Sequence, residues 1–103
     1  MKWPRKIRVN GKTFKVRLLA KPHLGKGAIG GLWVDEGEIR IWRGLSQKDR
    51  WITLLHEIMH LAWSTSVGNA FEKFEESLMV RLDTSLYEIL NRNFGFGDES
   101  DPT

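Results

Sequence analysis

The stretch SQKDRWITLLHEIMHLAWST, residues 46–65, decides the fold that this sequence predicts. It begins with Ser46, a typical N-cap residue, and Asp49 stands three residues later, as in a shortened capping box. Apolar residues then recur every three or four positions, which predicts one amphipathic helix that ends near Trp63–Thr65. The apolar stripe of this helix consists of Trp51, Leu54, Leu55, Ile58, Leu61 and Ala62.

Two of the three histidines in the chain, His56 and His60, lie four residues apart in this helix. Residues at that spacing share one helix face, so both imidazoles can bind one metal ion. Glu57 is displaced by one position, where it can take a proton from a water molecule whose pKa the metal lowers. The sequence contains no cysteine, which excludes disulfides and thiolate zinc sites and leaves histidine and carboxylate as ligands.

The alternative is that two histidines and a surface glutamate fall on an amphipathic helix by chance. His56 and His60, however, stand between two pairs of apolar residues, close to the apolar stripe rather than opposite it. Imidazoles and a carboxylate beside a core need partners for their polar atoms, and a metal ion provides one. The spacing therefore favours a zinc site over a chance arrangement.

The N-terminal half of the chain predicts strands. Apolar and basic residues alternate over residues 5–19 around Asn10-Gly11, the preferred pair for a two-residue hairpin turn. A loop over residues 21–31 follows, and its glycines lack the spacing of a phosphate-binding fingerprint. Two short strands are then expected, at about Leu32–Asp35 and Glu38–Trp42.

A second helix is expected at about Ala70 to Asn93, with Gly95 as its C-cap. Residues 1–95 are therefore expected to form a single domain, followed by a flexible acidic tail over residues 96–103. The expected fold class is α+β, with a small, mostly antiparallel sheet packed on two helices.

The segment Leu54 to Ala62, with a short strand before it and an acid-rich helix after it, resembles the zincin metallopeptidases. Within them it is most similar to the gluzincin type, and to the ImmA/IrrE-like and small phage- or prophage-encoded HExxH proteins. The resemblance covers about Gly31 to Asn93 and lacks the glycine and third histidine that follow His60 in metzincins. It implies a minimal zincin-like fold with Zn²⁺ held by His56, His60 and a glutamate of the following helix. It also implies hydrolysis of peptide bonds with Glu57 as the general base.

The third ligand must come from Glu72, Glu75 or Glu76, with Asp83 as an outside candidate. Helical periodicity alone favours Glu75, which lies near the centre of an apolar stripe, whereas Glu76 lies on its flank. The resemblance favours Glu76, because the phage-type proteins have a helix of the form E-x-x-apolar-x-x-L-x-x-x-L-Y, which Glu76 to Tyr87 match. We expect Glu76, with Glu75 as the nearest alternative; any of these acids can instead be a solvated residue at a helix N-terminus. The stripe consists of Phe71, Leu78, Leu82, Leu86 and Ile89.

One strand and two single residues are secondary candidates for contact with a substrate. The strand Glu38–Trp42 resembles the edge strand that pairs with extended substrate in zincins, although it is equally expected as an ordinary member of a three- or four-stranded sheet. His23, in a glycine-flanked loop, can either polarise a substrate carbonyl or simply be exposed. Tyr87 is a candidate for oxyanion stabilisation, but it lies about three helical turns beyond Glu76.

The net charge of +3 is unevenly distributed, because residues 1–34 contain nine lysines and arginines and no acid. Most of these basic residues lie in the predicted N-terminal hairpin, which can therefore attract nucleic acid. We favour the interpretation that they form a solvated face of the sheet. The alternative function for the chain is a zinc-binding regulatory or nucleic-acid-associated protein with little or no protease activity. The presence of Glu57 argues against it, since loss of the base is the simplest way to lose activity.

The expected partner is a peptide or protein substrate. No apolar run reaches the length of a membrane span and no secretory signal is recognised, so no membrane contact is expected. We therefore expect a cytoplasmic protein, in the host cytoplasm if the chain is phage-encoded.

Overall fold

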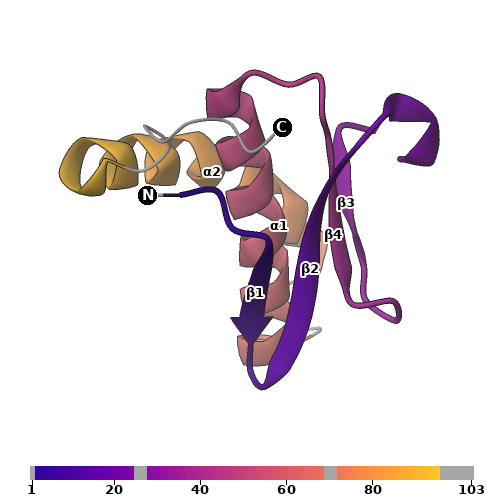
Figure 1. Cartoon of the computed structure of the whole chain (residues 1–103). Helices are drawn as coiled ribbons and strands as arrows, with labels where there is room; N and C mark the ends of the chain where they lie inside the picture. Colours follow the sequence, from indigo (N-terminus) through magenta and orange to yellow (C-terminus); the bar gives the residue numbers. More distant parts are fainter. Residues whose placement is uncertain (1, 25–27, 69–71, 96–103) are drawn as a thin grey trace.

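The computed structural model describes residues 2–24, 28–68 and 72–95 of the chain (Figure 1). These residues form a four-stranded sheet, a short 3-10 helix and two long α-helices, which confirms the predicted α+β class. In chain order the elements are β1 (Lys6–Val9), β2 (Lys12–Leu19), the 3-10 helix η1 (Lys21–His23), β3 (Gly30–Trp33), β4 (Glu38–Trp42), α1 (Gln47–Ser66) and α2 (Glu72–Phe94).

β1 and β2 form the predicted hairpin, with its turn at Asn10-Gly11. Both turn residues have positive φ, 48° at Asn10 and 83° at Gly11, as the favoured two-residue hairpin turn requires. The two strands pair antiparallel, with Ile7 opposite Phe14. Alternation along the strands therefore places apolar side chains on the inner face of the hairpin and Lys6, Arg8, Lys15 and Arg17 on its outer face.

The sheet has the order β1-β2-β4-β3, so β4 lies in its interior and β3 forms one edge. β2 and β4 run parallel, whereas the other two pairs are antiparallel, and the sheet is mostly antiparallel as predicted. The expectation that Glu38–Trp42 is a substrate-pairing edge strand is wrong, because β4 already pairs with a strand on each side. The alternative, an ordinary member of the sheet, is confirmed.

The edge strand β3 begins at Gly30, two residues before the predicted start at Leu32. The prediction that Gly30 and Gly31 belong to the preceding loop is wrong. A Cβ atom on Gly30 would lie 2.6 Å from the Cγ2 atom of Thr53 on α1. Glycine therefore lets this edge strand approach the helix more closely than a residue with a side chain would.

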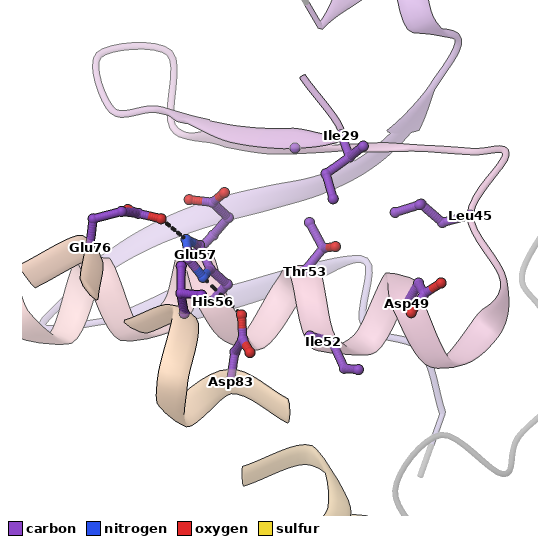
Figure 2. A pocket seen from close by; sticks show the side chains of 11 residues that line it. Ile29, Leu45, Asp49, Ile52, Thr53, His56, Glu57, Glu76 and Asp83 are labelled. Carbon is purple, nitrogen blue, oxygen red and sulfur yellow. Dashed lines mark hydrogen bonds and ion pairs between the residues drawn. The ribbon is translucent and has the colours of Figure 1, made fainter. Parts of the chain in front are cut away.

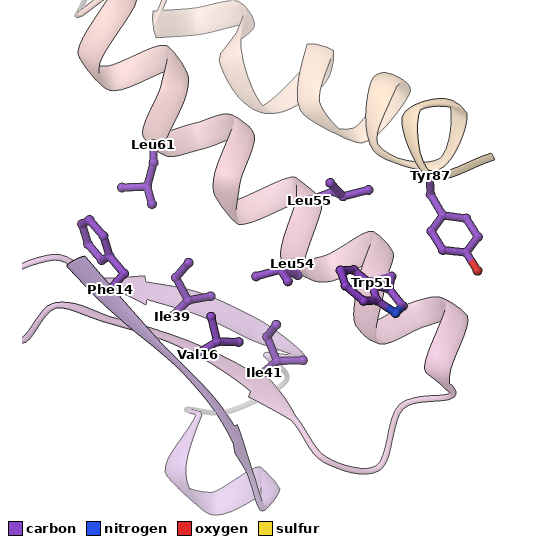
Figure 3. Close-up of a cluster of buried hydrophobic side chains, with 9 residues drawn as sticks. All are labelled: Phe14, Val16, Ile39, Ile41, Trp51, Leu54, Leu55, Leu61 and Tyr87. Atoms are coloured by element: carbon purple, nitrogen blue, oxygen red, sulfur yellow. The ribbon is translucent and has the colours of Figure 1, made fainter. Parts of the chain in front are cut away.

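α1 begins after Ser46, whose side chain accepts a hydrogen bond from the backbone N–H of Asp49, as the capping pattern predicts. The helix lies between the sheet and α2 (Figure 3). Its predicted apolar stripe is buried except for Ile58, which is half-buried, and Ala62, which is exposed. The hydrophobic core consists of Phe14, Val16, Ile39, Ile41, Trp51, Leu54, Leu55, Leu61 and Tyr87.

α2 presents a different face to α1 than its apolar stripe predicts. Leu82 and Ile89 of that stripe are 50% and 58% exposed, and Phe71 lies outside the described residues. The face that packs on α1 instead contains the buried Met79 and Tyr87. The same face carries the carboxylates that reach the histidines of α1. Leu86 of the predicted stripe also packs on the core, so the face of α2 toward α1 combines apolar side chains with these carboxylates.

α2 ends at the predicted glycine C-cap. Gly95 has a φ of 64°, and its backbone N–H donates a hydrogen bond to the carbonyl of Asn91. Within the described ranges, neither helix is long and apolar enough to pass through a membrane. The predicted acidic tail, residues 96–103, lies outside the described residues.

Candidate metal centre

The centre of the site is a pair of imidazole rings on consecutive turns of α1. The ring centres of His56 and His60 are 4.8 Å apart. Their Nε2 atoms face each other at 3.2 Å, and the two side chains are 17% and 18% exposed. The four-residue spacing in the sequence thus brings two ring nitrogens to one point that solvent can still reach.

α2 contributes a carboxylate to the same point. One carboxylate oxygen of Glu76, Oε1, lies 2.9 Å from the Nε2 of His56. The other, Oε2, lies 2.7 Å from the Nε2 of His60. One ligand atom from each of these three residues lies within 4.8 Å of the others. The structure therefore brings together the three residues that we expected to hold a metal ion.

The other acids of α2 contact the opposite sides of the imidazole rings. Asp83 Oδ2 lies 3.1 Å from the Nδ1 of His56, and Glu75 is hydrogen-bonded to the Nδ1 of His60. Glu75 and Asp83 are alternative ligands in the sequence analysis. In the structure they contact the Nδ1 atoms of the rings, on the side away from Glu76. The side chain of Glu72, the remaining candidate, lies outside the described part of the structure.

These contacts orient the rings of His56 and His60 as a metal ion requires. When a metal ion takes the lone pair of each Nε2, the proton of the neutral imidazole belongs on Nδ1, where Asp83 and Glu75 accept it. Two such lone pairs 3.2 Å apart repel each other unless a cation lies between them. Two nitrogen ligands about 2.0–2.1 Å from a tetrahedral zinc ion would be roughly 3.3 Å apart, close to this spacing. The donor set therefore fits a zinc ion.

Glu57 is buried beside the two histidines, with 8% of its surface exposed. It lies next to the edge strand, because a Cβ atom on Gly30 would be 3.8 Å from Glu57 Oε2. Burial raises the pKa of Glu57; His56 and His60 lower it, Glu76 raises it further, and the net shift is upward. A carboxyl group with a raised pKa accepts and releases a proton more readily near neutral pH.

The pKa of His60 is shifted as well. Burial lowers it, but the hydrogen bond with Glu75 and the charges of Glu76 and Glu57 outweigh burial and leave the pKa raised. A proton on this ring competes with a metal ion. The acids around this ring would therefore also make the binding of a metal ion depend on pH.

Two hollows flank the site, and Glu57 lines both of them. The first, of about 540 Å³, lies beside His56, and Figure 2 shows side chains of α1 and of the segments before β3 and α1 around it. The second, of about 500 Å³, lies beside His60 and extends to the hairpin turn. The apolar residues that line the first hollow are Ile29, Leu45, Ile52 and Val80. Those that line the second are Val9, Phe14, Leu32, Val34 and Leu61.

Two secondary candidates do not line these hollows. His23 lies in η1, where it borders a separate small hollow with Arg17, Leu19 and Arg40. Tyr87 is buried in the hydrophobic core. Their suggested roles at a substrate carbonyl or oxyanion therefore receive no support from the described structure.

Sequence reasoning missed the contact between Asp83 and His56. Glu76 and Asp83 are seven residues apart, which is about two helical turns, so they lie on one face of α2. That spacing is the signal from which the contact can be predicted. The close approach of Gly30 to Thr53 has no comparable signal, because it joins segments that are distant in the sequence.

Comparison with protein-family models, with curated proteins and with solved structures found no match to this chain. The geometry of the site therefore carries the functional interpretation. His56, His60 and Glu76 form a group that can hold a metal ion, and a buried carboxylate lies beside them.

Proposed function

We propose that this protein is a zinc-dependent metallopeptidase that hydrolyses peptide bonds. The observation that carries the proposal is the meeting of the two histidines of α1, Glu76 of α2 and the buried carboxylate of Glu57. Two imidazoles and one carboxylate are three protein ligands, which leave one position open for water or substrate. This is the ligand set of a catalytic zinc site rather than a structural one.

A zinc ion held by these residues would act as a Lewis acid that lowers the pKa of a water molecule and polarises the scissile carbonyl. Glu57 accepts a proton from the attacking water and later passes it to the nitrogen of the leaving amine. Glu57 holds the proton between the two steps, and its buried position beside the histidines keeps it close to both groups. Asp83 and Glu75 keep the imidazoles oriented throughout.

A peptide substrate fits the surroundings of Glu57. β3 is an edge strand of the described sheet, so an extended peptide can pair with its backbone. Gly30 brings this strand close to Glu57. The hollows on the two sides of Glu57 have apolar walls and can each take a side chain of that peptide. These features favour an extended peptide as the substrate.

Zinc content and peptide hydrolysis together test the proposal. The purified protein is expected to contain about one zinc ion per chain by elemental analysis and to cleave members of a peptide library. Glu57→Gln is expected to keep the zinc and lose cleavage, because the amide cannot accept a proton. His60→Ala is expected to lose both.

Glu88→Gln is the matched control, because it makes the same change at an exposed glutamate of α2 that pairs with Lys48. This variant is expected to keep both zinc and cleavage. Unchanged cleavage by Glu57→Gln would exclude the mechanism. A protein that binds zinc but leaves the whole library intact would instead support the alternative, a zinc-binding regulatory protein.

A further inference from the structure

The outer face of the sheet carries charges that the proposed peptidase does not use. Five basic side chains of β1, β2 and β4 lie on the side away from α1, with Glu38 as the acid among them in the described strands. Lys12 is not one of them, because its Nζ donates to the carbonyl of Val34 and it lines the hollow beside His60. The outer basic face consists of Lys6, Arg8, Lys15, Arg17 and Arg40.

Like charges stand directly opposite each other on this face. Lys6 is the cross-strand partner of Lys15, and Arg17 is the partner of Arg40. Such pairs destabilise a sheet. Glu38 offsets part of the repulsion, since it bonds to Arg17 at 3.2 Å and to Arg40 at 2.7 Å. One carboxylate among five cations still leaves the face positive and suited to a polyanion.

A small hollow of about 260 Å³ lies on the same face and is lined by basic side chains. Arg17, Arg40 and His23 border it, with Leu19 as the remaining wall. Guanidinium groups bind phosphate oxygens through paired, charge-assisted hydrogen bonds. The hollow therefore has the chemistry to hold a phosphate group.

Two tryptophans lie along this face beneath basic groups. The guanidinium carbon of Arg40 is 4.2 Å from the ring centre of Trp33, and Lys21 Nζ is 4.6 Å from that of Trp42. Trp42 also covers Gly44, where a Cβ atom would lie 2.4 Å from the indole. Trp33 in turn covers Gly31 of β3, where a Cβ atom would lie 3.1 Å from the indole. Rings that lie over glycines of their own chain do not project into a bilayer, so a lipid surface fits this face poorly. Aromatic rings and guanidinium groups, by contrast, are the side chains on which the bases of single-stranded nucleic acid stack.

We propose that the outer basic face binds single-stranded nucleic acid through its phosphate backbone. Along each strand, alternate residues on one face are about 6.6–6.8 Å apart, so one nucleic-acid chain can contact several cations in a row. Trp33 and Arg40 provide an aromatic ring and a guanidinium group, the two kinds of group on which bases stack. The metal centre lies on the opposite side of the sheet, next to α1. Nucleic acid and peptide therefore bind without competing.

Two triple variants of equal net charge test the proposal. The first replaces three cations of the outer basic face, and the second replaces three exposed cations of α2. Binding to a fluorescent single strand of about 20 nucleotides is measured by anisotropy between roughly 50 and 200 mM salt, with and without EDTA. The first variant carries Lys6→Ala, Arg8→Ala and Lys15→Ala, and the second carries Lys73→Ala, Arg81→Ala and Arg92→Ala.

The salt dependence of binding separates the two variants. For a single strand, each phosphate contact contributes about −0.7 to the slope of log affinity against log salt. Five contacts give the wild type a slope of about −3.5, and the two that remain in the outer-face variant give about −1.4. The outer-face variant is also expected to bind about tenfold more weakly or worse at the lowest salt. The α2 variant and the EDTA-treated wild type are expected to behave like the untreated wild type.

Three results would overturn the proposal: no binding by the wild type, equal losses in the two variants, or tighter binding to phosphatidylserine vesicles than to the oligonucleotide. If the outer-face variant does not fold, chemical acetylation of the wild type provides a second measurement. Bound oligonucleotide is expected to protect Lys6 and Lys15 but not Lys73, and equal labelling of the three would also contradict the proposal. None of these outcomes depends on peptidase activity.

Discussion

Removing the charge of Asp83 is expected to weaken zinc binding although Asp83 is not one of the three proposed ligands. Its Oδ2 atom lies 3.1 Å from the Nδ1 of His56, and both side chains are mostly buried. In Asp83→Asn the side chain keeps its size but loses the charge that favours a proton on Nδ1. The ring then loses its fixed tautomer and part of its basicity as a ligand.

The expected magnitude follows from the length of this contact. Loss of the partner behind a metal-binding histidine typically lowers metal affinity about 10–100-fold, or about 1.4–2.7 kcal/mol. Charge-assisted hydrogen bonds from nitrogen to a carboxylate are usually about 2.7–2.9 Å long. Because the contact of Asp83 is longer, at 3.1 Å, we expect a loss near the lower end, about tenfold.

Competition with a chromophoric zinc chelator at neutral pH measures this affinity, and circular dichroism checks that the variant is folded. Glu88→Gln, an acid-to-amide change at an exposed position of the same helix, is expected to bind zinc like the wild type. An Asp83→Asn protein that is folded and binds zinc with unchanged affinity would refute the reasoning that this carboxylate prepares His56 for the metal.

Glu57→Gln is expected to raise the unfolding temperature of the metal-free protein at neutral pH. The wild type loses stability as pH rises from the ordinary pKa of an unfolded glutamate through the raised pKa of Glu57, and the amide of the variant removes that loss. Calorimetry measures the unfolding temperature of both proteins against pH, and parallel profiles would contradict this. Gly30→Ala is expected to cost about 1–3 kcal/mol in urea unfolding, because its methyl group meets Thr53, and an unchanged midpoint would show that β3 can move away. Zinc affinity is expected to fall by up to about tenfold per pH unit below the raised pKa of His60, because a proton on the ring takes the place of the metal. Zinc titrations at several pH values measure this affinity, and an affinity that does not change with pH would exclude the prediction. Zinc at about 100 times its Kd is expected to add about 2.7 kcal/mol to the free energy of unfolding of the wild type and nothing to that of His60→Ala, and equal gains would place the metal elsewhere.

The sequence was sufficient where a short stretch determines its own structure. The turn at Asn10-Gly11, the N-cap at Ser46 and the C-cap at Gly95 each depend on a few neighbouring residues, and each is where it was predicted. The meeting of His56 and His60 belongs to the same class, because both rings project from one helix at a spacing that helical geometry sets.

Contacts between distant segments were harder to predict. The alternating pattern of residues 38–42 is the same for an edge strand and for an interior strand, and only the pairing of the whole sheet distinguishes them. The choice between Glu75 and Glu76 depends on the rotation of α2 about its own axis. Periodicity predicted that rotation from the stripe around Leu82, which the structure leaves half exposed.

The rotation of α2 is itself informative about the site. Burial of an apolar side chain contributes about 1.5–3 kcal/mol, yet Leu78, Leu82 and Ile89 remain exposed. In their place, α2 turns three carboxylates toward the two imidazoles of α1, an arrangement that carries a desolvation cost. A bound metal ion would offset part of this cost, because its positive charge attracts the carboxylate and the imidazole lone pairs. The ion that we propose between α1 and α2 would therefore favour this helix packing, which leaves three apolar side chains exposed. Loss of that ion should loosen α2 from α1 before it disturbs the sheet.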